Sequence, residues 1–221
     1  MKVELSEVTN ARNFFSSHDD LTTDATESTG MKRLVDSLAS SSQIGGPAWD
    51  QVRESLNTYS SALEARINLA TNMGEIITGV LDDIIEYLTT DDGNGTYSSL
   101  DPGSIPALEE ELRKMDRNIE ALKRYKETLY IEQKTTDEDG NEVVYKMKDL
   151  EGRQRVQDDI DAVLEDREIF QKLLNKINGY VELYNDCIGR LDSITADISE
   201  FENAYSNIIE GQSVLYDDYS Y

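Results

Sequence analysis

The longest periodic stretch of the chain begins near Leu150 and continues to about Glu210. Its apolar residues keep a near-heptad spacing without proline, which predicts one long helix that buries a continuous stripe. These residues are Ile160, Val163, Leu164, Phe170, Leu174, Ile177, Val181, Tyr184, Ile188, Leu191, Ile194, Ile198, Phe201, Tyr205 and Ile208. Such a helix measures roughly 90 Å at about 1.5 Å per residue, so shorter helices can pack along it in series. We therefore expect an all-α fold, an elongated antiparallel helical bundle with this helix as its spine.

A helical hairpin is expected over residues 31–91. Its first apolar stripe holds Met31, Leu34, Val35 and Leu38, and its second holds Val52, Leu56, Tyr59, Leu63, Ile67, Ala70, Ile77, Leu81, Ile84 and Leu88. Gly45, Gly46 and Pro47 separate the two helices, because glycine readily adopts positive φ and proline suits the first turn of a helix. The only tryptophan, Trp49, lies at that corner.

Residues 92–103 contain glycine, proline and turn-forming residues without periodicity, which indicates a linker. As a calcium loop this segment offers Asp92 and Asn94 before Gly95. It has Thr90 and Asp101 at the first and last ligand positions, however, so it does not fit the template. No metal site is expected there.

A helical extension is expected over residues 104–215, interrupted by a β-hairpin at 129–147 that is the only β-structure expected in the chain. Pro106 lies near the first turn of its first helix. The strand-like runs 129–131 and 143–145 flank a turn that contains Asp139-Gly140, a pair typical of tight hairpin turns. The polar residues 1–30 are compatible with a short helix and a weakly held helical arm. The whole chain, 1–221, is expected to be one domain.

The charge of the chain disfavours several classes of partner. Lys and Arg number 21 against 45 Asp and Glu, a formal net charge of −24, which repels nucleic acid and anionic membrane surfaces. No stretch is long and apolar enough to suggest a membrane span, and no Sec-type signal peptide is recognised. A basic partner or an acidic export intermediate fits this charge better, although a solvated acidic surface needs no partner at all.

Residues for common catalytic sites are scarce. His18 is the only histidine and Cys187 the only cysteine, so neither a Ser/His/Asp set nor a disulfide within the chain is expected. The pairs Asp82-Asp83 and Asp158-Asp159 lie on helices whose opposite faces are apolar, which is typical of solvated faces. The expectation is a protein without catalytic residues, cofactor or metal, with Cys187 as an inert core thiol.

A short helix, a glycine-rich turn with tryptophan, a longer helix and the sequence Tyr87-Leu88-Thr89-Thr90-Asp91 together resemble the hairpin of the WXG superfamily. The opening Met1–Val8, the run Gly45–Arg53 and the helical extension resemble its LXG branch. Gln51 stands where a strict Trp-x-Gly has glycine, and Gln43-Ile44-Gly45 is an imperfect Leu-x-Gly. Tyr97 to Asp101 and Tyr145 to Asp149 also fit Tyr-x-x-x-acid, so only the position of Tyr87 at a helix end distinguishes it.

This resemblance implies the N-terminal targeting domain of an antibacterial toxin, exported by type VII secretion in Gram-positive bacteria without a cleaved signal. The implied partners are small helical WXG-like or chaperone proteins and the secretion ATPase. The implied site residues are Gly45, Gly46, Trp49, Tyr87 and Asp91.

Part of the second helix of the hairpin is expected to remain available to a partner, because Ile76, Val80 and Ile85 widen its stripe. The alternative is a non-enzymatic coiled-coil structural or adaptor protein, such as a spacer, a chaperone-like adaptor or a phage component. In that case Trp49 is a core residue and Tyr87 packs like any aromatic.

Overall fold

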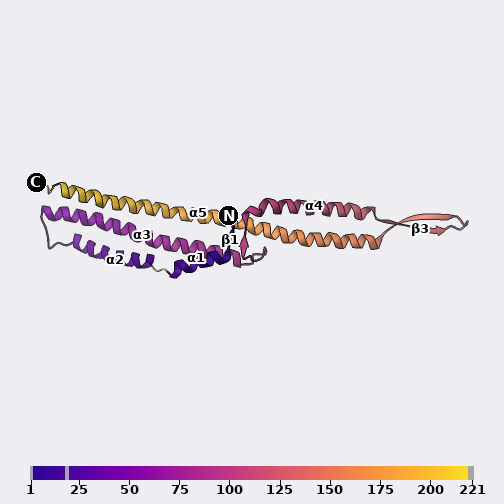
Figure 1. Ribbon diagram of the computed structural model, residues 1–221, viewed down its shortest axis with the longest axis horizontal. Coiled ribbons are helices and arrows are strands. Elements are labelled where there is room, and N and C mark those ends of the chain that lie inside the picture. Colours follow the sequence, from indigo (N-terminus) through magenta and orange to yellow (C-terminus); the bar gives the residue numbers. More distant parts are fainter. Residues whose placement is uncertain (1, 18–19, 219–221) are drawn as a thin grey trace. The chain divides into compact units, whose positions relative to one another are not determined.

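The computed structural model describes residues 2–17 and 20–218 and confirms the all-α fold class with a small β-hairpin (Figure 1). Its helices are α1 (Leu5–Ser17), α2 (Asp20–Ala39), α3 (Pro47–Thr89), α4 (Ile105–Thr128) and α5 (Leu150–Asp218), with the 3₁₀ helix η1 (Pro102–Ser104). Its strands are β1 (Val3–Glu4), β2 (Ser99–Leu100), β3 (Tyr130–Thr136) and β4 (Glu142–Lys148).

The chain folds as two compact units, and α5 contributes to both. The first unit contains residues 90–181 and the N-terminus up to Val3. The second contains residues 4–89 and the chain from Glu182 onward.

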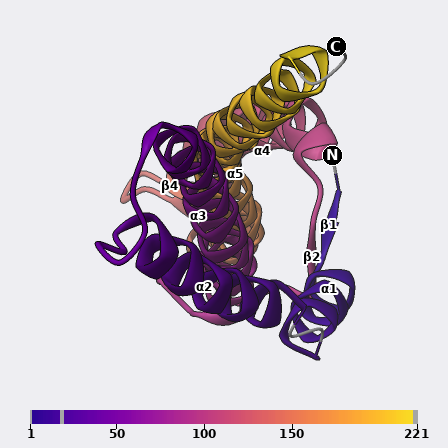
Figure 2. The same ribbon diagram turned by 90° about the vertical axis from the view of Figure 1, so that its left-hand side faces the viewer.

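In the second unit, α3 lies between α2 and the C-terminal part of α5 in both views (Figures 1 and 2). Helices α2 and α3 are antiparallel, and α1 packs against α3 at the other end of this helix. The C-terminal part of α5 is joined to α3 by an ion pair between Arg190 and Asp83 and by a hydrogen bond from Asn72 to Asp197. Helices α2 and α3 therefore form the predicted helical hairpin, and α3 is the central helix of this unit.

In the first unit, α4 packs against the N-terminal half of α5 around Ile119, Val156 and Ile160, which are all buried. Arg167 Nε donates to Asp116 Oδ1 over 2.6 Å between the same two helices. Strands β3 and β4 connect them as an antiparallel hairpin whose turn includes Gly140 at φ +85°. Positive φ explains the glycine at this position of the turn.

Helix α2 begins well before the expected start of the hairpin at residue 31. Residues 22–30 carry few apolar side chains, and the sequence therefore indicates only a weakly held arm. The structure instead places them in α2, where Arg66 of α3 forms an ion pair with Asp24 and Ser28 is fully buried. Contacts with α3 supply the stability that the local sequence lacks.

The expectation that residues 129–147 hold the only β-structure is wrong. Strand β1 pairs with β2, and β2 lies inside the segment expected to be an unstructured linker. Each of these strands has only two residues. Each nevertheless buries one apolar side chain, Val3 in β1 and Leu100 in β2. The long C-terminal helix also continues beyond Glu210, to Asp218.

Candidate functional site

The corner between α2 and α3 is built on the backbone of Gly46. Its φ of +110° is strained for any residue with a side chain. Its carbonyl oxygen accepts from the Trp49 and Asp50 amides, over 2.9 Å and 3.1 Å, and so begins the hydrogen-bond pattern of α3. Gly45 has no such φ and no neighbouring atom where a Cβ would lie. Of the two predicted glycines, only Gly46 is therefore required by the backbone.

Arg53 of α3 also joins the two helices at this corner. Its Nε donates to the carbonyl oxygen of Ala39, the last residue of α2, over 2.9 Å. A cation at this position satisfies a terminal carbonyl and complements the negative end of the helix dipole. The sequence analysis did not single out Arg53, because its partner is a backbone atom in another helix.

Trp49 lies half-buried in the first turn of α3. Its Nε1–H is shielded from solvent, yet no acceptor for it is found among the described residues. A buried donor without an acceptor costs about 1–3 kcal/mol. The indole therefore combines a packed ring with an unsatisfied polar atom.

Four exposed apolar residues lie on the two helices that meet at this corner: Leu34 and Leu38 of α2, and Val52 and Tyr59 of α3. We call them the apolar strip. Leu34 is 68% exposed although it belongs to the predicted stripe of its helix. Val80, which was expected to remain available to a partner, is instead buried, and Ile76 and Ile85 are half-buried.

The residues of the apolar strip lie on one side of the α2–α3 pair. Two contacts mark where these helices face each other: Ser60 donates to Asp36, and Arg53 donates to Ala39. Successive residues of a helix are rotated by about 100°. Measured from these contacts, the strip residues of both antiparallel helices therefore face the same side of the pair. The same contacts place Leu34 level with Tyr59.

Tyr87 lies at the opposite end of α3 from Trp49. At about 1.5 Å per residue the two are roughly 57 Å apart along the helix axis. Tyr87 is half-buried, between the buried Ile84 and Leu88. The structure thus separates the predicted site residues into a corner group and an end group.

Asp91 organises the loop that follows α3. Its Oδ1 accepts from the amides of Gly93 and Gly95, each over 2.9 Å, and both glycines have positive φ. These bonds give Asp91 a local structural function, whether or not it also belongs to a recognition motif.

The same loop is held by a buried lysine that the sequence analysis did not single out. Lys176 of α5 is 1% exposed, and its Nζ donates to the Thr90 carbonyl over 2.9 Å. It also lies 3.4 Å from Asp92 Oδ1. The Asn94 amide, and secondarily Lys176, lowers the pKa of Asp92 below its ordinary value.

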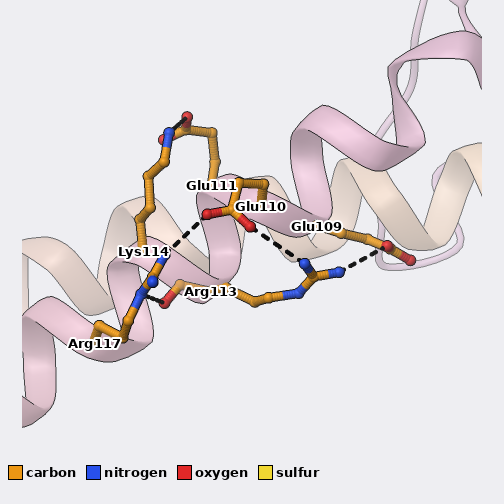
Figure 3. Close-up of polar contacts among 6 residues, drawn as sticks. All are labelled: Glu109, Glu110, Glu111, Arg113, Lys114 and Arg117. Carbon is orange, nitrogen blue, oxygen red and sulfur yellow. Dashed lines mark hydrogen bonds and ion pairs between the residues drawn. The ribbon is translucent and has the colours of Figure 1, made fainter.

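Several acidic residues of the helices form ion pairs. On α4, the carboxylates of Glu109, Glu110 and Glu111 contact Arg113, Lys114 and Arg117 (Figure 3). Asp82 and Asp83, expected to form a solvated face, are partly exposed and also pair with Arg12 of α1 and Arg190 of α5. The α4 pairs lie within one helix, whereas the pairs of Asp82 and Asp83 join α3 to α1 and α5.

Among the described residues, no group of three or more His, Cys, Asp or Glu is arranged to hold a metal ion. His18 lies outside the described residues. Cys187 is buried, and burial raises the pKa of its thiol. A high pKa leaves the sulfur protonated and weakly reactive.

None of the helices among the described residues combines the length and the apolarity that a membrane span requires. In comparisons with known proteins, the chain matches no family model and no curated protein.

Proposed function

We propose that this chain is a type VII secretion substrate, or the LXG-type targeting domain of a secreted antibacterial toxin, and that small helical proteins recognise it. The observation that carries the proposal is the apolar strip, which is solvent-exposed beside the Trp49 corner of a two-helix hairpin. Amphipathic helices bind by laying an apolar face against a surface of this kind. The sequence resemblance supplies the identity of the system.

The strip suits a helical partner in shape. Its residues come from two antiparallel helices, so a third helix can lie along both and bury them together. Trp49 precedes Val52 by three residues, which makes them neighbours on the α3 surface and extends the strip to the corner.

The net charge of −24 favours a partner with basic flanks. Lysine or arginine beside the apolar face of the partner accelerates association and favours the correct pairing.

The test is binding and export of strip variants. Leu38→Asp and Val52→Asp each place a charge in the centre of the proposed contact, and should weaken capture of the helical proteins encoded beside this gene by at least about 10-fold. Ile169→Asp is the matched control, because it adds the same charge at an exposed isoleucine of the other unit. Export should require the secretion ATPase and fall with the strip variants alone. Undiminished binding and export of both strip variants refutes the proposal.

Trp49→Ala and Tyr87→Ala separate recognition from folding. Truncating an aromatic at a contact centre costs about 2 kcal/mol or more of binding energy. Trp49→Ala is expected to weaken partner binding or export while helix content, measured by circular dichroism, stays nearly constant. Tyr87→Ala is expected to affect export more than folding. If Trp49→Ala melts the protein without a separate binding defect, Trp49 is a core residue, as the alternative coiled-coil reading requires.

A further inference from the structure

The β3–β4 hairpin has an uncharged, partly apolar face that the described residues leave largely exposed. In the register, Ile131 is opposite Met147, Gln133 opposite Tyr145, and Thr135 opposite Val143. Opposed residues share a face, and side chains alternate along a strand, so these six residues form one uncharged face. Tyr145 is 55% exposed, and Ile131 and Met147 are also exposed. A two-stranded hairpin with so little burial is marginally stable by itself.

The opposite face of the hairpin is charged and internally paired. Glu132 lies opposite Lys146 in the register, and Lys134 forms an ion pair with Glu142 over 2.7 Å. These residues suit contact with water. Lys148 lies opposite Tyr130 and therefore has no acidic residue directly across the hairpin.

Two hydrogen bonds show which backbone groups of β4 point away from β3. Asp149 donates to the Leu129 carbonyl, and Asp137 donates to the Asn141 carbonyl, one position beyond each end of the ladder. Bonded and non-bonded pairs alternate in an antiparallel ladder, so residues 143, 145 and 147 direct their N–H and C=O groups toward β3. Residues 142, 144, 146 and 148 direct theirs to the open edge of this two-stranded sheet.

We propose that the open edge of β4 pairs with the same edge of a second copy of this chain, giving a symmetric four-stranded antiparallel sheet. Tyr145 is the middle residue of β4. With the two-fold axis at Tyr145, the edge residues face edge residues of the other copy, as the alternation of hydrogen bonds requires. Tyr145 then lies opposite Tyr145, and Val143 opposite Met147, each in a non-bonded pair with close side chains.

The charges of β4 favour this register. With the axis at Tyr145, Glu142 of each copy lies opposite Lys148 of the other, and Val144 lies opposite Lys146. A shift that puts the axis at Lys146 brings two lysines together, which is unfavourable. A shift to Val144 leaves Met147 and Lys148 opposite residues of the turn. Only the Tyr145 register pairs the whole strand with opposite charges at both ends.

The hairpin has room for such a pairing, because β3 and β4 project beyond the paired ends of α4 and α5 (Figure 1). Its turn carries Asp137, Glu138 and Asp139, which disfavours insertion into an anionic lipid surface. In the symmetric sheet this acidic turn approaches the Lys148 end of the other copy. Since one strand per chain is a small interface, we expect a weak dimer with a dissociation constant of about 1–100 μM. The inference rests on the hairpin alone and is independent of partner binding at the apolar strip.

Sedimentation velocity of the 221-residue chain over about 1–200 μM tests the dimer. Lys148→Glu puts two acidic residues opposite each other at both ends of the pairing, and should raise the dissociation constant about 10-fold. Lys123→Glu makes the same change of charge on α4, where Lys123 is exposed, and should leave the constant unchanged. A chain that stays monomeric, or an equal effect of both variants, overturns the proposal.

Cysteine cross-linking tests the register. Tyr145→Cys should give a disulfide-linked dimer under mild oxidation, because residues in a non-bonded antiparallel pair lie within disulfide distance. Gln133→Cys changes the residue directly opposite within the hairpin and should not cross-link. The unsubstituted chain is the second control, because Cys187 is buried. Failure of Tyr145→Cys to cross-link, or equal cross-linking of Gln133→Cys, overturns the proposal even if a dimer is observed. A monomer whose β4 edge binds a strand of a different protein overturns it as well.

Discussion

Replacing Lys176 by methionine should loosen the loop that follows α3. The substitution keeps most of the aliphatic stem and removes the ammonium group, which is 2.9 Å from the Thr90 carbonyl and 3.4 Å from Asp92. A hydrogen bond from a charged donor contributes about 1.5–3 kcal/mol. Removal of the cost of burying an ammonium offsets part of this contribution. We therefore expect a loss of about 1.5 kcal/mol in the free energy of unfolding.

Urea denaturation followed by circular dichroism measures this loss, and hydrogen exchange at the amides of residues 93–95 locates it. Lys172→Met is the matched control, because Lys172 is a half-buried lysine one turn away whose ion pair with Glu168 is accessible to water and contributes little to stability. Lys176→Met is expected to accelerate exchange in the loop, and Lys172→Met is not. A Lys176→Met protein as stable as the Lys172→Met protein, with unchanged exchange, would show that the buried ammonium contributes no net stability.

Two further predictions concern the α2–α3 hairpin. Gly46→Ala should lower the free energy of unfolding by about 1–2 kcal/mol because a Cβ is strained at φ +110°, whereas Gly45→Ala should not, and thermal melting compares the two. The Ser60 hydroxyl, and secondarily Lys32, lowers the pKa of Asp36, so the stability that this carboxylate contributes is present above its ordinary pKa and is lost as pH falls through the lowered value. Ser60→Ala should therefore reduce the loss of stability on acidification below about pH 4, measured by urea titration at several pH values, and an unchanged pH dependence would contradict this.

The helices that the sequence predicted well are those with strong local signals. Pro47 and Pro106 lie in the first turns of α3 and α4, where a missing N–H costs nothing, and both helices carry long apolar stripes. The β-hairpin was predicted because the spacing of its apolar residues changes around Asp139-Gly140. In each case residues close in sequence determine the structure.

Contacts between distant residues decided the rest. Residues 22–30 are helical through contacts with α3, and β1 pairs with β2 across nearly 100 residues of sequence. The spacing of apolar residues predicts that Leu34 lies in an apolar stripe and that Val80 widens another. It does not predict which neighbouring helix covers each stripe. Only the packing shows that Val80 is buried and Leu34 exposed, and this difference moves the candidate recognition surface to the Trp49 corner.

The candidate site shows the same division. Glycine, proline and tryptophan at residues 45–49 mark a corner from sequence alone, because their backbone preferences are local. The roles of Arg53 and Lys176 depend on backbone carbonyls at Ala39 and Thr90, which carry no signal in the sequence. A carbonyl that needs a donor becomes recognisable only when tertiary structure brings a charged side chain within hydrogen-bonding distance.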